Sequence, residues 1–141
     1  MRKFLMLLLM VACCFLGSIF AQNGKSIVVD NIAPGDILIN EVLFNPYDDG
    51  EDFVELYNNT TDTILMNNIR LATWDDDLQR LKTMVALPDS VFLLPQDYMV
   101  LTIDTDAIHR YYTVRNSSKL VVMKKMPAYS NRQGVVVVSL K

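Results

Sequence analysis

The chain has 141 residues, with 13 basic and 16 acidic side chains and a formal net charge of −3 at pH 7. This length suggests one domain. The acidic balance, without clustered Lys or Arg, argues against nucleic acid as a partner and against adhesion to anionic membrane surfaces.

Residues 1–21 have the layout of a secretory signal peptide. Arg2 and Lys3 precede an uninterrupted apolar run over residues 4–20, and Ala21 supplies a small residue for cleavage. The run is slightly shorter than the roughly 20 apolar residues that a transmembrane anchor needs. We therefore expect an exported protein that is secreted, periplasmic or held at the cell surface.

The segment "MVAC", Met10–Cys13, also resembles a bacterial lipobox, in which Cys13 would carry a lipid anchor. The apolar run continues past Cys13 to Phe20, whereas a lipobox normally ends it, so lipoprotein anchoring is the weaker alternative. Because Cys13 and Cys14 both lie in this segment, the mature chain would have no disulfide, no cysteine zinc site and no thiol nucleophile.

Residues 22–35 form a linker-like lead with a short strand expected near residues 26–29. Residues 36–44 are apolar at both parities, which predicts a strand covered on both faces. Pro46 and Gly50 flank an acidic turn, after which residues 53–58 form the return strand. Further strands are expected at residues 64–66, 69–74, 81–87, 91–94, 98–103, 120–123 and 135–140.

One helix is expected over residues 104–112, capped by Asp104 or Asp106. About eight short strands with turns every 8–12 residues predict an all-β fold, an antiparallel β-sandwich or barrel, with one short helix. No long helical pattern alternates with the strands, which argues against a parallel α/β sheet.

Five segments resemble, in order and spacing, the bacterial lamin-tail domain: "GDILINEVLFNP", "DFVELYN", "NNIRLATWDDD", "LLPQDYMVLTID" and "MPAYSNRQGVVVV". The resemblance covers residues 36–141. It implies an immunoglobulin-like β-sandwich of the lamin-tail type, a module of secreted and cell-surface proteins, and it implies no enzymatic activity.

Lamin-tail domains usually continue beyond the strand that matches "GVVVV", so the resemblance implies a domain that lacks its last strands. Val135–Leu140 would then be an unpaired, apolar and β-prone segment. Such a segment favours edge-to-edge pairing, and we predict self-association through Val135–Leu140.

The acidic stretch over residues 41–55 allows three interpretations. Glu41 and Glu55 would form a glycosidase-like carboxylate pair if the two strands pair. Alternatively, a loop cluster would bind calcium, although it lacks the EF-hand spacing; its candidate ligands are Asp48, Asp49, Glu51 and Asp52. The third and preferred interpretation is structural, with turn-forming carboxylates in the loop. The strand glutamates would accept hydrogen bonds from the backbone or from an arginine, with Arg70 as the nearest candidate.

Two other features invite a functional hypothesis. His109 is the only histidine, but it lies in the polar helix and no nucleophile elbow accompanies it. Tyr111, Tyr112 and Trp74 would suit a sugar-binding patch, although core or sheet-packing positions are preferred for them.

The sequence thus predicts a non-enzymatic, exported module without cofactors that binds a protein or glycan of the cell envelope. The alternatives are a calcium-dependent or carbohydrate-binding module, or a remnant of a larger exported enzyme such as a nuclease. The role rests on analogy, because a fold does not fix a function.

Overall fold

The computed structural model describes residues 27–130 and 133–140. The predicted signal peptide, the lipobox around Cys13 and residues 22–26 of the predicted lead lie outside the described residues. Within them, no helix is long and apolar enough to span a bilayer.

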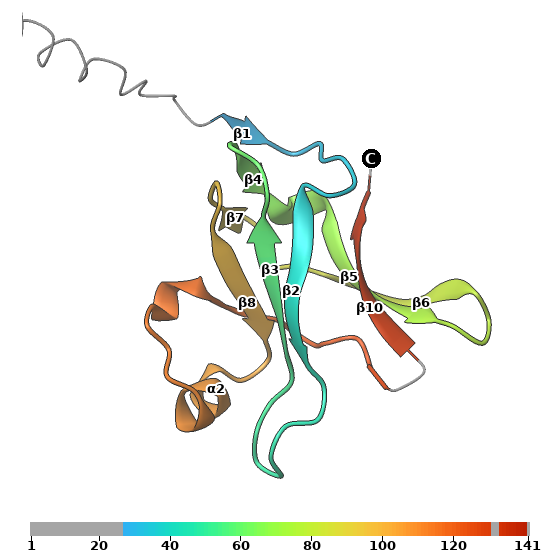
Figure 1. Cartoon of the computed structure of the whole chain (residues 1–141), viewed down its shortest axis with the longest axis vertical. Coiled ribbons are helices and arrows are strands. Elements are labelled where there is room, and N and C mark those ends of the chain that lie inside the picture. Colours follow the sequence, from blue (N-terminus) through green and yellow to red (C-terminus); the bar gives the residue numbers. More distant parts are fainter. Residues whose placement is uncertain (1–26, 131–132, 141) are drawn as a thin grey trace, which may run out of the picture.

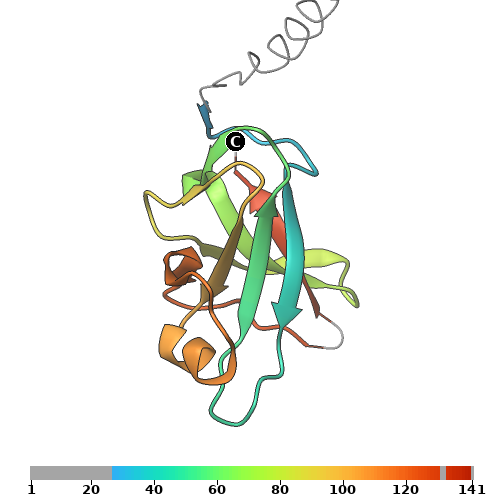
Figure 2. The ribbon, with the colours of Figure 1, turned by 60° about the vertical axis from the view of Figure 1, so that its left-hand side comes forward.

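The described chain is an all-β sandwich with one α-helix, as predicted, and its two larger sheets face each other across the core (Figure 1). One sheet has the order β2-β3-β8-β9, the other β10-β5-β6, and a small third sheet has the order β1-β4-β7. Figure 2 shows β2, β3 and β8 in front of β5 and β10. The strands are β1 (Val28–Val29), β2 (Ile37–Leu43), β3 (Phe53–Asn58), β4 (Thr63–Leu65), β5 (Ile69–Asp75), β6 (Arg80–Ala86), β7 (Phe92–Leu93), β8 (Tyr98–Thr102), β9 (Leu120–Val122) and β10 (Gln133–Ser139).

The core lies between the inner faces of these sheets. On β3, Val54 and Leu56 are completely buried, and so are Leu101 on β8 and Leu71 on β5. Phe53 is also buried, on the opposite side of β3, where its ring meets that of Tyr112 edge-on at 5.7 Å. Phe53 and Val54 therefore face opposite sides of the sheet, since successive side chains of a strand point to opposite faces.

The prediction of a β2 covered on both faces is wrong. β2 is an edge strand, and Leu38, Asn40 and Glu41 are exposed along it. Apolar residues occur at both odd and even positions of β2, but only one side of the strand faces the core and the other is partly open. The hydrophobic pattern alone does not distinguish this arrangement from burial on both sides.

The prediction of an unpaired Val135–Leu140 is also wrong, because β10 pairs along its length with β5. The sandwich is not purely antiparallel either: β8 pairs with β9, and β1 with β4, in parallel. A parallel pair needs a long crossover. Between β8 and β9 that crossover holds α2 (Thr105–Tyr111) and the 3₁₀ turn η2 (Ser117–Lys119).

Helix α2 begins where the sequence predicts. The Asp104 side chain is the N-cap and accepts hydrogen bonds from the backbone N–H groups of Asp106 and Ala107 at 2.9 and 3.2 Å. Ala107 and Ile108 bury the inner side of the helix. The helix thereby fixes the segment that follows it, residues 112–116, beside the outer face of the four-stranded sheet.

Candidate functional site

The acidic stretch is a hairpin whose strands are β2 and β3 and whose tip is anchored to α2. Asp49 accepts from Arg110, with Nη1 and Oδ2 2.9 Å apart, and also from the Tyr111 hydroxyl. The rings of Tyr47 and Tyr111 stack at 5.0 Å. Gly50 is required at the tip, because a Cβ there would lie 2.8 Å from that of Pro46.

The four predicted calcium ligands do not converge on a common point. Asp49 is engaged with the helix, and Glu51 Oε1 accepts from the backbone N–H of Asp52 at 3.1 Å. Burial raises the pKa of the Asp52 carboxyl. In residues 27–130 and 133–140, no three His, Cys, Asp or Glu side chains are grouped to hold a metal ion.

Glu41 and Glu55 do come together, through an irregularity in β2. The β2–β3 register shifts between Ile39 and Glu41, so that Glu41 lies directly opposite Glu55. Such a bulge adds one residue to one strand and redirects its side chains. Here Asn40 also turns toward the outer face, and its Nδ2 donates to Glu55 Oε1 at 2.7 Å.

The predicted role of Arg70 is wrong. Arg70 lies on β5, in the other sheet, and its Nη1 donates to the backbone oxygens of Asn67 and Ile69 at 2.8 Å. The donor that reaches Glu55 is the neutral amide of Asn40. The two facing carboxylates thus keep acceptor capacity on the outer side of the sheet.

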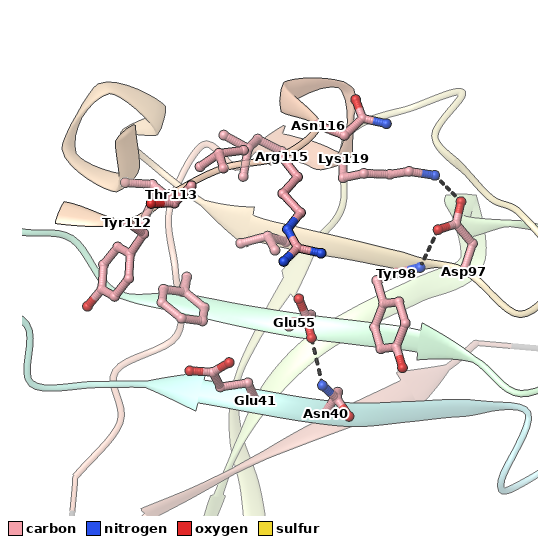
Figure 3. Close-up of a pocket in the computed structure, with 15 residues that line it drawn as sticks. Asn40, Glu41, Glu55, Asp97, Tyr98, Tyr112, Thr113, Arg115, Asn116 and Lys119 are labelled. Atoms are coloured by element: carbon pink, nitrogen blue, oxygen red, sulfur yellow. Dashed lines mark hydrogen bonds and ion pairs between the residues drawn. The ribbon is translucent and has the colours of Figure 1, made fainter. Parts of the chain in front are cut away.

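An open groove with a volume of about 590 Å³ covers this pair (Figure 3). Its floor is the outer face of β2, β3 and β8, and its wall is the segment that follows α2. Polar lining comes from Asn40, Glu41, Glu55, Asp97, Thr113, Arg115, Asn116 and Lys119, and aromatic or aliphatic lining from Phe53, Tyr98, Val100, Ile108, Tyr112, Val114 and Leu120.

Arg115 extends from the wall over Glu55 (Figure 3). Neither the Arg115 guanidinium nor the Glu41 carboxylate makes a hydrogen bond or ion pair with another of the described residues. At one end of the groove, Lys119 is bound to Asp97. As far as the described residues go, the groove thus contains a free cationic donor and carboxylate acceptors. Beside them lies Tyr98, a 42% exposed residue whose ring packs against that of Tyr57 at 4.7 Å.

The aromatic side chains predicted as a patch separate in the structure. Tyr112 lines the groove, Tyr111 packs on the hairpin tip, and Trp74 lies half-buried on β5. His109 is exposed, with Nε2 3.3 Å from the Ser117 hydroxyl, and it lies outside the groove lining.

Sequence reasoning missed Asn40, Tyr98, Arg115 and Lys119. Arg115 is 60 positions from Glu55, and the bulge at Asn40 leaves no mark in the local pattern. The paired glutamates were the one available signal for the site.

No protein-family model matches this chain, and neither does any curated protein. The resemblance to the bacterial lamin-tail domain therefore stays a prediction.

Proposed function

We propose that this protein is a non-catalytic, exported binding module, and that the groove over Glu41 and Glu55 is its ligand site. The supporting observation is the convergence in one open groove of the two facing carboxylates, the exposed Tyr98 and Arg115, which pairs with none of the described residues. Its volume of about 590 Å³ lies within the range of about 300–1,000 Å³ of small-ligand sites.

Of the two predicted partners, an envelope glycan suits this groove better than a protein. The carboxylates and the Asn40 carbonyl accept hydrogen bonds, whereas the guanidinium and amide groups donate them. A sugar hydroxyl can do both, so it finds a partner in the groove for either role. The Tyr98 ring offers an apolar face beside these groups, and Tyr combines an apolar body with a polar tip.

A hydrolytic role for the glutamate pair is less well supported. A general acid of this kind needs a carboxyl kept protonated by an apolar pocket. Glu41 is exposed to water, and Glu55 lies in an open groove, where it accepts a hydrogen bond from Asn40, so neither carboxyl has an apolar pocket of this kind.

The test is binding to isolated bacterial sacculi and to soluble envelope oligosaccharides, by pull-down and calorimetric titration. We expect Tyr98→Ala and Glu55→Gln each to weaken binding about tenfold, since each removes a groove contact worth about 1.4 kcal/mol. Tyr47→Ala, at a 69% exposed tyrosine outside the groove, is the matched control and keeps the affinity of the unmodified chain.

Equal losses in the Tyr47 and Tyr98 variants would place the ligand elsewhere and contradict the proposal. Release of new reducing ends from the oligosaccharides, abolished by Glu41→Gln, would instead establish a hydrolase.

A further inference from the structure

β10 has an open edge. It pairs with β5 without a register shift, from Gln133 opposite Asp75 to Ser139 opposite Ile69. On its other side, a cavity of about 800 Å³ separates Val137–Ser139 from residues 31–37. Within the described part of the chain, no backbone hydrogen bond joins β10 to β2 or to that lead segment.

The open backbone groups belong to alternate residues. Leu140 N–H donates to Asn68 O at 2.9 Å, and hydrogen-bonded pairs alternate along an antiparallel ladder. Val138, Val136 and Gly134 therefore bond to β5, whereas Val135, Val137 and Ser139 direct N–H and C=O outward.

Gln133, at the start of β10, supports this assignment of the residues whose backbone groups point away from β5. The outward N–H and C=O of Gln133 bond to Ser130, at 3.0 and 3.4 Å. Beyond Gln133, the outward groups of Val135, Val137 and Ser139 have no such cover among residues 27–130 and 133–140.

The other long edge strands carry features that oppose pairing, and β10 does not. β2 has the bulge and the exposed Glu41, and β6 has exposed Arg80 and Lys82. The remaining edges are short: β1 and β7 have two residues each and β9 has three. Charges, bulges and short length are the usual protection of an edge, and β10 has seven uncharged residues with none of these.

We propose that two copies of this protein dimerise by antiparallel pairing of their β10 edges about a two-fold axis at Val137. Val137 pairs with Val137 of the second copy, and Val135 pairs with Ser139. The three-stranded sheets of the two copies then form one continuous sheet. Because the interface is isologous, it closes at two copies.

The sequence of β10 is compatible with itself as this partner. In the stated register, Val136 of one copy lies opposite Val138 of the other on the outer face of the sheet. Both are half-buried and apolar, so no like charges meet. Apolar cross-strand pairs of this kind stabilise sheet pairing, whereas like charges directly opposite each other destabilise it.

Two double variants that share one substitution test this register. Val136→Lys with Val138→Lys places two pairs of like charges across the axis, whereas Val136→Lys with Val138→Glu places two opposite-charge pairs there. In sedimentation equilibrium of the full exported chain, we expect a dimer for the unmodified protein and for the Lys/Glu variant. For the Lys/Lys variant, we expect the dissociation constant of the dimer to be about tenfold higher.

We expect the dimer of the unmodified protein to have a dissociation constant of about 1 μM or below. A protein that is still monomeric at about 100 μM would therefore overturn the proposal. Assemblies larger than a dimer would overturn it as well. Equal affinities of the two double variants would overturn it too. Thermal melts of both variants confirm that each is folded.

Amide exchange of the unmodified protein gives a test that needs no variant. The amides of Val136 and Val138 should be protected at every protein concentration, because β5 holds them. Those of Val135, Val137 and Ser139 should gain protection only as the concentration rises. Protection of Val137 at all concentrations would show that another segment of the chain occupies the edge, and would overturn the proposal.

Discussion

At the scale of single residues, the buried side chain of Asn58 links segments that are far apart in the sequence. It is completely buried at the end of β3, and its Nδ2 donates to the backbone oxygens of Asp62, Leu93 and Leu94 at 2.8–3.0 Å. Its Oδ1 accepts from the N–H and the hydroxyl of Thr60. One amide thus joins the turn after β3 to the end of β7.

Asn58→Ala should therefore lower the free energy of unfolding by about 2–4 kcal/mol, because it leaves several buried backbone groups without their partner. Asn59→Ala is the control: its neighbouring amide is exposed and makes one bond of 3.3 Å, so a cost below about 1 kcal/mol is expected. Urea denaturation of both variants measures the difference. If both variants lose the same free energy of unfolding, water replaces the hydrogen bonds of Asn58 without a loss of stability, which would contradict the prediction.

At the scale of elements, one carboxylate links the two strands and the turn of the β5–β6 hairpin. Asp75 lies at the end of β5, where Lys82 Nζ lies 2.9 Å from Oδ2 and the Leu78 N–H donates to Oδ1 at 2.9 Å. The hydrogen bond from Lys82, and then that from Leu78, hold the pKa of Asp75 below its ordinary value of 3.8. The carboxylate closes the turn and pairs the two strands.

Because this pKa is lower in the folded chain, Asp75 contributes stability above pH 3.8, and that contribution is lost as the pH falls through the folded value. Asp75→Asn does not titrate, so the stability difference between the two proteins should shrink from about pH 5 to about pH 2. Denaturation curves over this range measure it. Asp76→Asn, at an exposed neighbouring residue, is the control. If the difference in unfolding free energy between the unmodified protein and Asp75→Asn does not change with pH, the stabilising role of the Asp75 carboxylate is refuted.

Elements were also where sequence reasoning succeeded best. Three local signals predict the turn before β3, β3 itself and α2, because each acts over a few positions. They are the turn residues Pro46 and Gly50, the aromatic and β-branched residues of 53–58, and the Asp104 cap. The edge position of β2 and the partner of Arg70 were missed, because both depend on which strands become neighbours in the sheets.

At the scale of the whole molecule, the acidic loop holds the β2–β3 hairpin against α2, and this argues against the alternative of a calcium-dependent module. Asp49 already engages Arg110 and Tyr111, which join the β2–β3 hairpin to α2. A calcium site needs 6–8 oxygen ligands around one point, and the described carboxylates supply no such group.

We therefore expect neither calcium nor EDTA to change the melting temperature of the protein. A ligand that binds only the folded state raises stability with its concentration, so even a weak site would appear in a titration with calcium. A rise that Asp48→Asn and Asp49→Asn abolish would establish the calcium-dependent module instead.

By itself, the sequence determined the β-strand content, the acidic turn after residue 44 and the capped helix, because turn chemistry and the strand preference of aromatic and β-branched residues act locally. Only the tertiary structure decided that Arg115, Glu41 and Glu55 line one groove, and that β10 has no second partner strand among the described residues while β2 and β6 carry bulges or charges. The physical reason is that both features arise from register and pairing between segments far apart in the chain, where one inserted residue reverses which side chains face outward.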